Sequence, residues 1–154
     1  MLTQKINQLL KSREFISVAT CDFNGRPNAV PKFLLKAEDN FIYLVDYTIG
    51  RTWENLKVNP RVSLSLTDKD NLTGYQVNGS VQIVDSGPVY EEIVDELERR
   101  KVSLSVERII EGIHQEKTHE SFELAMHQKF VVFKVKIEEI VEVAPSGALK
   151  REKV

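Results

Sequence analysis

The segment FIYLVDYTIGRTWENLKVNPRVSLSL, residues 41–66, decides the fold. Its first six residues read as a strand, and its last six alternate apolar side chains with small polar ones. Such alternation has the period of two that a half-buried strand requires. Between the two strands, Thr52 can act as the N-cap of one or two helical turns, and Pro60 would stop them. The segment therefore predicts a strand, a short helix and a second strand.

Strands of the same period lie on both sides of this segment. FISVATC (15–21) and NAVPKFLLK (28–36) flank the turn DFNGRP, whose Asn-Gly pair is typical of a hairpin. YQVNGSVQIVD (75–85) carries Gly79 in mid-strand, where a glycine often marks a bulge or a barrel bend. FVVFKVKIEEIVEV (130–143) is the last strand. Six strands with short turns predict a mainly β fold, a six-stranded antiparallel split β-barrel.

Helical patterns occur at the N-terminus, over residues 2–12, and in an insertion between the last two strands. The insertion, residues 88–128, opens with a helix whose first position is a proline. Residues 105–114 and 118–127 have the pattern of two further helices. Because no linker is long enough to divide the chain, we expect a single domain, 1–154, with a helical insertion. The tail APSGALKREKV is expected to fray.

The composition excludes several classes of protein. The net charge of −2 argues against nucleic acid as the main partner. No apolar run approaches the ~20 residues that a membrane-spanning helix needs, and the N-terminus does not resemble a signal peptide. A single cysteine, Cys21, rules out an internal disulfide framework and fits a reducing compartment, so we expect a cytoplasmic protein.

The stretch VDYTIGRTWENL, residues 45–56, has the residues of a phosphate site. Gly50 permits an unusual backbone angle, and the helix start after it offers free N–H groups and the positive end of a dipole. Arg51 can add a bidentate guanidinium contact, and Thr48 and Thr52 can donate hydroxyl hydrogen bonds. The alternative is that Thr52 is merely a cap and Arg51 a solvated surface residue.

The segments 24–35, 41–66 and 74–85, with the strand 130–143, resemble the FMN-binding split-barrel family, which includes pyridoxamine 5′-phosphate oxidase. The resemblance implies that Arg51 and Thr52 hold the flavin phosphate. It also implies a homodimer with two flavins at its interface. The isoalloxazine ring would lie along two strands, contacted largely by backbone, at Pro31, Lys32, Phe33, Val45, Asp46, Tyr47 and Thr48.

A lysine near the flavin ring can favour the anionic reduced flavin, which gives Lys32 a possible role in the chemistry. The alternative for Lys32 is an outward-facing strand lysine. The chain departs from the pyridoxamine oxidases at Pro31, where they carry an arginine. It also lacks a counterpart of their C-terminal Arg- and Trp-rich substrate segment. We therefore expect a substrate other than pyridoxamine 5′-phosphate.

Other candidate sites are weaker. His114, His119 and His127 have spacings that do not bring them together on one helix face, so we predict no metal site. The sequence favours an FMN-dependent oxidoreductase that acts on a small molecule. A non-enzymatic flavin or haem carrier on the same barrel stays open, as does a deazaflavin in place of FMN. An oligonucleotide-binding barrel would need a basic groove with exposed aromatic residues, which the net charge disfavours.

Overall fold

The structure, a computed structural model, describes residues 2–100 and 129–154. The chain divides into two compact units. One unit comprises Met1–Ile83 and Val131–Val154 and forms the barrel, whereas Val84–Phe130 form the second unit and contain the expected insertion. That the two units make up one domain stays a prediction.

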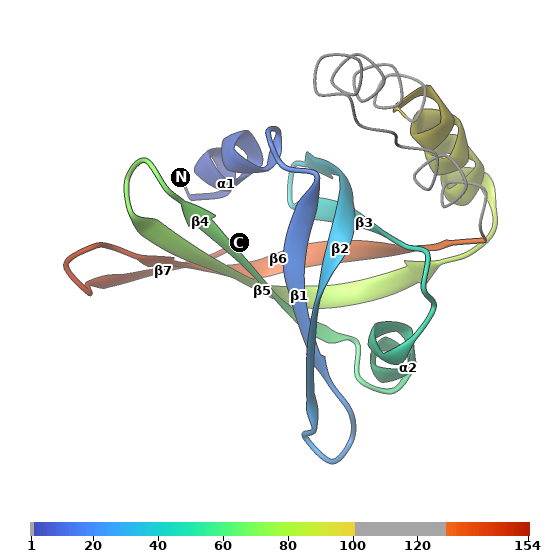
Figure 1. Ribbon diagram of the computed structural model, residues 1–154, viewed down its shortest axis with the longest axis horizontal. Coiled ribbons are helices and arrows are strands. Elements are labelled where there is room, and N and C mark those ends of the chain that lie inside the picture. Colours follow the sequence, from blue (N-terminus) through green and yellow to red (C-terminus); the bar gives the residue numbers. More distant parts are fainter. Residues whose placement is uncertain (1, 101–128) are drawn as a thin grey trace, which may run out of the picture. The chain divides into compact units, whose positions relative to one another are not determined.

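Six antiparallel strands form a closed barrel in the order β3-β2-β1-β4-β5-β6 (Figure 1). Pairing between β3 and β6, from Phe41 opposite Lys136 to Asp46 opposite Val131, closes the barrel. The predicted six-stranded antiparallel barrel is thus confirmed. The strands are β1 Phe15–Cys21, β2 Pro27–Glu38, β3 Phe41–Asp46, β4 Arg61–Asp68, β5 Thr73–Val84 and β6 Val131–Val143.

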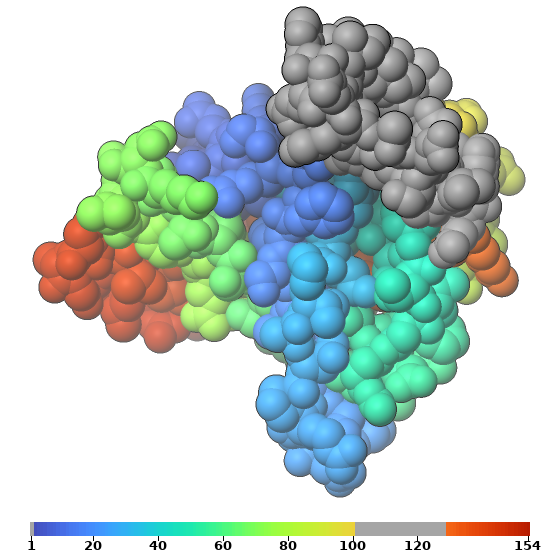
Figure 2. Space-filling model, in the orientation of Figure 1, coloured from blue at the N-terminus to red at the C-terminus, as the bar shows by residue number. Residues whose placement is uncertain are grey.

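The turn between β1 and β2 forms as its Asn-Gly pair predicts. Gly25 has a φ of 74°, in the left-handed region that glycine adopts without steric cost. Asp22 Oδ1 accepts hydrogen bonds from the backbone N–H groups of Asn24 and Arg26, each at 2.9 Å. The hairpin stands out from the body of the barrel in the space-filling view (Figure 2).

A seventh strand, β7 (Leu149–Lys153), corrects the prediction of a frayed tail. It pairs antiparallel with β6, from Val143 opposite Leu149 to Glu139 opposite Lys153. The connecting turn is closed by a hydrogen bond from Ala144 N to Ala148 O, at 2.9 Å. The tail was expected to fray because chain termini are often poorly ordered, but β6 extends past its pairing with β3 and gives the tail a pairing partner.

Apolar side chains fill the interior of the barrel. Each of the six barrel strands contributes almost fully buried residues, which alternate with less buried ones most regularly in β1 and β4. Little room for a ligand is left inside, as expected for a barrel of six short strands. The core includes Leu2, Ile6, Leu10, Val18, Leu34, Ile42, Leu44, Leu64, Val77, Phe133, Val135 and Ile137.

Helix α1 (Leu2–Leu10) covers one end of the barrel with its apolar side, as the pattern at residues 2–12 predicts. An ion pair ties it to β6, with 2.9 Å between Lys5 Nζ and Glu142 Oε2. The hydroxyl of Tyr75 donates a hydrogen bond to the same oxygen, at 3.1 Å. Hydrogen bonds with Tyr75 and Glu142 raise the pKa of Lys5, and the bond from Lys5 lowers the pKa of Glu142.

Helix α2 (Arg51–Val58) lies at the other end of the barrel, against β1 and β2 (Figure 1). It ends at the C-cap Asn59, directly before Pro60, as predicted. Its N-cap is Gly50, so the prediction that Thr52 caps the helix is wrong. The reason is that the Thr52 side chain is buried against the barrel, where its hydroxyl has another partner.

In the second unit, residues 88–100 form a helix, as predicted for the start of the insertion. Ile93 and Leu97 are buried on its apolar stripe. The predicted helices 105–114 and 118–127, together with the three histidines, lie outside the described residues. Within residues 2–100 and 129–154, no helix is long and apolar enough to span a membrane.

Gly79 lies where β5 leaves no room for a Cβ atom beside the backbone of β6. A Cβ atom added to it would lie 2.1 Å from the carbonyl oxygen of Lys136 on β6. We predict that Gly79→Ala lowers the free energy of unfolding by about 1–3 kcal/mol, because backbone must shift to admit the methyl group. Urea denaturation measures this loss.

Gly74→Ala is the matched control, since it lies in the same strand. Its added Cβ would be 3.7 Å from Val143 Cβ, an ordinary contact. Alanine there also reduces the entropy of the unfolded chain, so we expect no loss of stability. Equal denaturation midpoints for the two variants would contradict this account of Gly79.

Candidate functional site

A buried ion pair lies at the α2 end of the barrel. Lys32 Nζ on β2 is 2.6 Å from Asp46 Oδ1 at the end of β3. Only 7% of the Lys32 side chain and 1% of the Asp46 side chain are exposed. The two residues face the interior, so the interpretation of Lys32 as an outward-facing lysine is wrong. Burying two charges is costly unless they are paired and hydrogen-bonded, and here they are.

The same carboxylate holds the turn that leads into α2. Asp46 Oδ1 accepts hydrogen bonds from the backbone N–H of Thr48, at 3.1 Å, and from its hydroxyl, at 2.7 Å. Lys32 Nζ also donates to Thr48 Oγ1, at 3.1 Å. Asp46 Oδ2 is buried and has no hydrogen-bond partner among the described residues. One carboxylate oxygen thus joins β2, β3 and the turn.

The turn has an unusual backbone. Gly50 has φ −113° and ψ −138°, outside the helical and extended regions, in line with the unusual angle predicted there. Ile49 has a φ of 44°, in the left-handed region that β-branched residues rarely adopt. Such a conformation costs on the order of 1–3 kcal/mol and persists only where surrounding contacts impose it. The side chain of Ile49 packs against the core, and Asp46 holds the preceding residue.

Two side-chain hydrogen bonds fasten α2 to the barrel. Asn28 Nδ2 on β2 donates to Thr52 Oγ1, and Asn55 Nδ2 donates to Thr20 Oγ1 on β1, each at 3.1 Å. None of Thr20, Asn28 and Asn55 was predicted from the sequence as a site residue. The sequence did contain a sign of Thr20, because this polar residue stands at a position of β1 where the alternation predicts a buried apolar residue.

The start of α2 has the properties of an anion site. Among the described residues, no side chain caps the helix, so its first N–H groups are not taken by a capping side chain. Arg51 is the first residue of the helix, and 62% of its side chain is exposed. Among residues 2–100 and 129–154, its ion-pair partner is Glu54, with a long distance of 3.4 Å from Nη1 to Oε2. These donors suit a phosphate monoester. The Thr52 side chain is buried and its hydroxyl accepts a hydrogen bond from Asn28, so Thr52 offers such a ligand its backbone N–H.

The residues predicted along the flavin ring divide into those on the outer face, those in the interior, and those in the turn after β3, where Tyr47 is half-buried and Thr48 exposed. Pro31 is exposed and Phe33 half-buried on the outer face of β2, where the Phe33 ring meets that of Phe15 edge to face at 5.8 Å. Val45 is buried, and Lys32 and Asp46 face the interior. A ligand on the outer face of the barrel can therefore meet Lys32 and Asp46 only through their backbone.

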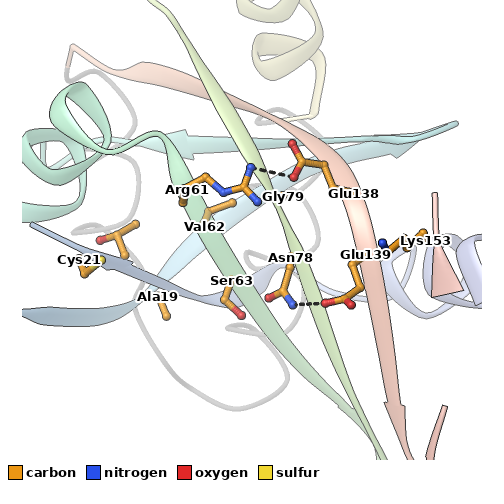
Figure 3. Close-up of a pocket in the computed structure, with 11 residues that line it drawn as sticks. Ala19, Cys21, Arg61, Val62, Ser63, Asn78, Gly79, Glu138, Glu139 and Lys153 are labelled. Carbon is orange, nitrogen blue, oxygen red and sulfur yellow. Dashed lines mark hydrogen bonds and ion pairs between the residues drawn. The ribbon is translucent and has the colours of Figure 1, made fainter. Parts of the chain in front are cut away.

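A hollow of about 690 Å³ opens on the outer face of β1, β4, β5, β6 and β7, with Lys153 as its lining residue on β7 (Figure 3). Arg61 Nη1 lies 2.8 Å from Glu138 Oε2 there, and Asn78 Nδ2 donates to Glu139 Oε2 at 2.9 Å. Hydrogen bonds from Ser80 and from Arg61 lower the pKa of Glu138, and the one from Asn78 lowers the pKa of Glu139. None of the predicted site residues lines this hollow, and the sequence analysis missed it.

Neither Cys21 nor a cluster of metal-binding side chains provides a second site among the described residues. Cys21 lies at the edge of the hollow, half-buried, and its Sγ accepts a hydrogen bond from Asn59 Nδ2 at 3.2 Å. No group of histidine, cysteine and carboxylate side chains within residues 2–100 and 129–154 could hold a metal ion.

The model of the family described as "Pyridoxamine 5′-phosphate oxidase" matches residues 2–144, nearly the whole chain. The chain belongs to this family. No curated protein matches it significantly. The match covers the barrel strands β1 to β6 together with α1, α2 and the insertion. The family assignment therefore rests on residues 2–144 rather than on one motif.

Solved structures with this fold are similar along most of their length. HupZ of Group A Streptococcus is 24% identical, with a TM-score of 0.68, covering 97% of this chain and 99% of that one. A Clostridium acetobutylicum protein related to general stress protein 26 is 18% identical, with a TM-score of 0.66, covering 99% and 94%. A pyridoxamine 5′-phosphate oxidase-related, FMN-binding protein of Nostoc punctiforme is 11% identical, with a TM-score of 0.57, covering 99% and 93%.

We predict that Asp46→Leu lowers the free energy of unfolding by about 3–5 kcal/mol, because it leaves the buried Lys32 ammonium unpaired. Adding Lys32→Met removes both charges and is expected to restore much of the loss. Urea denaturation of the two variants measures the difference. A double variant as unstable as the single one would contradict the view that an unpaired buried charge causes the loss.

Proposed function

We propose that this member of the pyridoxamine 5′-phosphate oxidase family binds FMN and serves as a flavin-dependent oxidoreductase acting on a small molecule. The observation that carries the proposal is the start of α2, where an exposed arginine stands at a helix N-terminus without a side-chain cap among the described residues. Family membership and the FMN-binding relative from Nostoc punctiforme support the choice of ligand.

The flavin phosphate binds at Arg51 and Thr52 in this proposal. A guanidinium and the first N–H groups of a helix together present several donors to one phosphate, and the helix dipole adds to their attraction. Riboflavin lacks the phosphate and makes none of these contacts. The site therefore distinguishes FMN from riboflavin.

The isoalloxazine ring lies on the outer face, along residues 31–33 and 45–48. The filled interior of the barrel supports this placement, because the core residues leave no space for a three-ring system. Bound FMN would supply the electron transfer itself. The protein's part is to hold the phosphate and to place the ring against β2 and β3. Lys32 contributes through its backbone, because its ammonium group is bound to Asp46.

The working unit of the proposal is a cytoplasmic homodimer. A flavin on the open face of one barrel would leave one side of its ring exposed to water, whereas ligand pockets usually bury most of their ligand. A second copy related by a two-fold axis can cover both flavins with one self-complementary surface. The single cysteine agrees with a reducing compartment.

The alternative is a flavin or haem carrier without turnover. The absorption spectrum of the purified protein, followed by release of its chromophore, separates FMN, deazaflavin and haem. Flavin reduction by nicotinamide donors then separates an oxidoreductase from a carrier. Because the substrate segment of the pyridoxamine oxidases has no counterpart, we expect no efficient oxidation of pyridoxamine 5′-phosphate.

We predict that Arg51→Ala weakens FMN binding roughly 10- to 100-fold, since a charge-assisted hydrogen bond contributes about 1.5–3 kcal/mol. Riboflavin affinity is expected to stay nearly constant. Titration followed by flavin fluorescence measures both. Arg151→Ala on β7 is the control, because that side chain is 58% exposed and forms a similar ion pair, 3.5 Å from Glu139. Equal losses for the two flavins would place the phosphate elsewhere.

We also predict that flavin binding and dimerisation stabilise each other, because a ligand shared between two subunits binds only their assembly. Light scattering of apo and holo protein over a dilution series measures the dimer, and flavin fluorescence measures binding. A monomer that keeps full FMN affinity at concentrations where no dimer survives would rule out the shared site.

A further inference from the structure

The buried pair Lys32–Asp46 is linked to the proposed phosphate site through a single residue, Thr48. Asp46 accepts two hydrogen bonds from Thr48, and Lys32 donates a third to its hydroxyl. We propose that Lys32 and Asp46 are positioning residues that hold the turn before α2, and that they thereby set the preference for FMN over riboflavin. This inference rests on the proposed function.

The turn needs such a restraint because its conformation is unfavourable by itself. Ile49, between Thr48 and Gly50, is held at a φ of 44°. A β-branched residue leaves this region when its surroundings allow. A change at Ile49 would alter the direction in which the chain enters α2, and with it the positions of Arg51 and of the first N–H groups. The hydrogen bonds from Thr48 to Asp46 oppose that change.

Lys32 acts through Asp46 rather than on the ligand. Its ammonium group is 2.6 Å from the carboxylate and its side chain points into the barrel. The carboxylate neutralises its charge there, and the outer face receives only its backbone. Lysine in turn fixes the carboxylate: without it, Asp46 would be a buried charge with no cation beside it.

A purely stabilising role does not account for this arrangement. A buried ion pair can often be replaced by apolar residues of similar size without loss of stability. Apolar residues, however, accept no hydrogen bond from Thr48. Replacing the pair therefore separates the two roles, because packing can be restored while the restraint on the turn is lost.

The test compares two double variants. In Lys32→Met/Asp46→Leu the buried pair is replaced. In Lys5→Met/Glu142→Leu the same substitutions remove the pair at the opposite end of the barrel, where 2.9 Å separates the charges. Affinities for FMN and riboflavin are measured for both and for the unchanged protein, alongside urea denaturation.

We expect the first double variant to lose about 10-fold or more of its preference for FMN over riboflavin, the equivalent of one charge-assisted hydrogen bond. The control should keep the preference within about 2-fold, inside the scatter of such comparisons. A first variant that is folded and keeps the original preference overturns the inference. If the double variant does not fold, Thr48→Val replaces it in the same comparison. This substitution, at an exposed position, removes the hydroxyl that donates to Asp46.

Amide hydrogen exchange provides a readout that needs no flavin. The N–H of Glu54 donates to Gly50 O at 3.0 Å in the first turn of α2, whereas that of Asn59 donates to Asn55 O at 2.7 Å at the other end. We expect exchange at Glu54, and not at Asn59, to accelerate in Lys32→Met/Asp46→Leu. If the unchanged protein binds no flavin, the proposed function fails, and unchanged exchange at Glu54 would then overturn the positioning role as well.

Discussion

Pairing of β3 with β6 is the constraint on which the rest of the barrel depends. It joins residues 41–46 to residues 131–136, far apart in the sequence, and it leaves no free edge along that part of the six barrel strands. Once closed, a barrel of six short strands has an interior that side chains fill completely. Everything polar is thereby confined to the two ends of the barrel and to its outer face.

The two ends meet this constraint differently. At the α1 end, leucine and isoleucine side chains cover the core, and the charged pair of Lys5 with Glu142 remains partly exposed. At the α2 end, hydrogen bonds between threonine and asparagine side chains attach the helix to the barrel, and the Lys32–Asp46 ion pair is almost completely buried. Directional hydrogen bonds restrict the position of a helix more closely than apolar contacts do, which is consistent with the phosphate site proposed at the start of α2.

The sequence was sufficient for the strands because period-two alternation reports burial directly, as in β4 with its buried Val62, Leu64 and Leu66. The sequence pattern did not show that the Lys32 side chain faces the interior of the barrel. Neighbouring residues of a strand point to opposite faces, and Pro31-Lys32-Phe33 mixes polar and apolar residues, so the pattern alone did not decide which of them faces inward. The partner of Lys32 is fourteen residues away, and only the β2–β3 register brings it close.

Local rules also failed where tertiary contacts competed with them. Thr52 has the chemistry of an N-cap, yet the hydrogen bond from Asn28 draws its hydroxyl into the barrel, and the cap falls to Gly50. Of the nine predicted site residues, the structure brings Lys32, Asp46 and Thr48 into one network. Arg51 and Thr52 follow at the start of α2, and Pro31 and Phe33 lie on the outer face. The hollow beside Arg61 joins five strands and has no signature within any one of them.

The ribbon of β6 and β7 gives the sheet a terminal strand, since β7 is the last in the order β3-β2-β1-β4-β5-β6-β7. Terminal strands are templates on which other chains can add strands and aggregate. Here that strand reads Leu-Lys-Arg-Glu-Lys, so four of its five residues are charged. A foreign strand would have to desolvate these charges before it could pair. The charged residues of β7 therefore disfavour the addition of a second chain at this edge of the sheet.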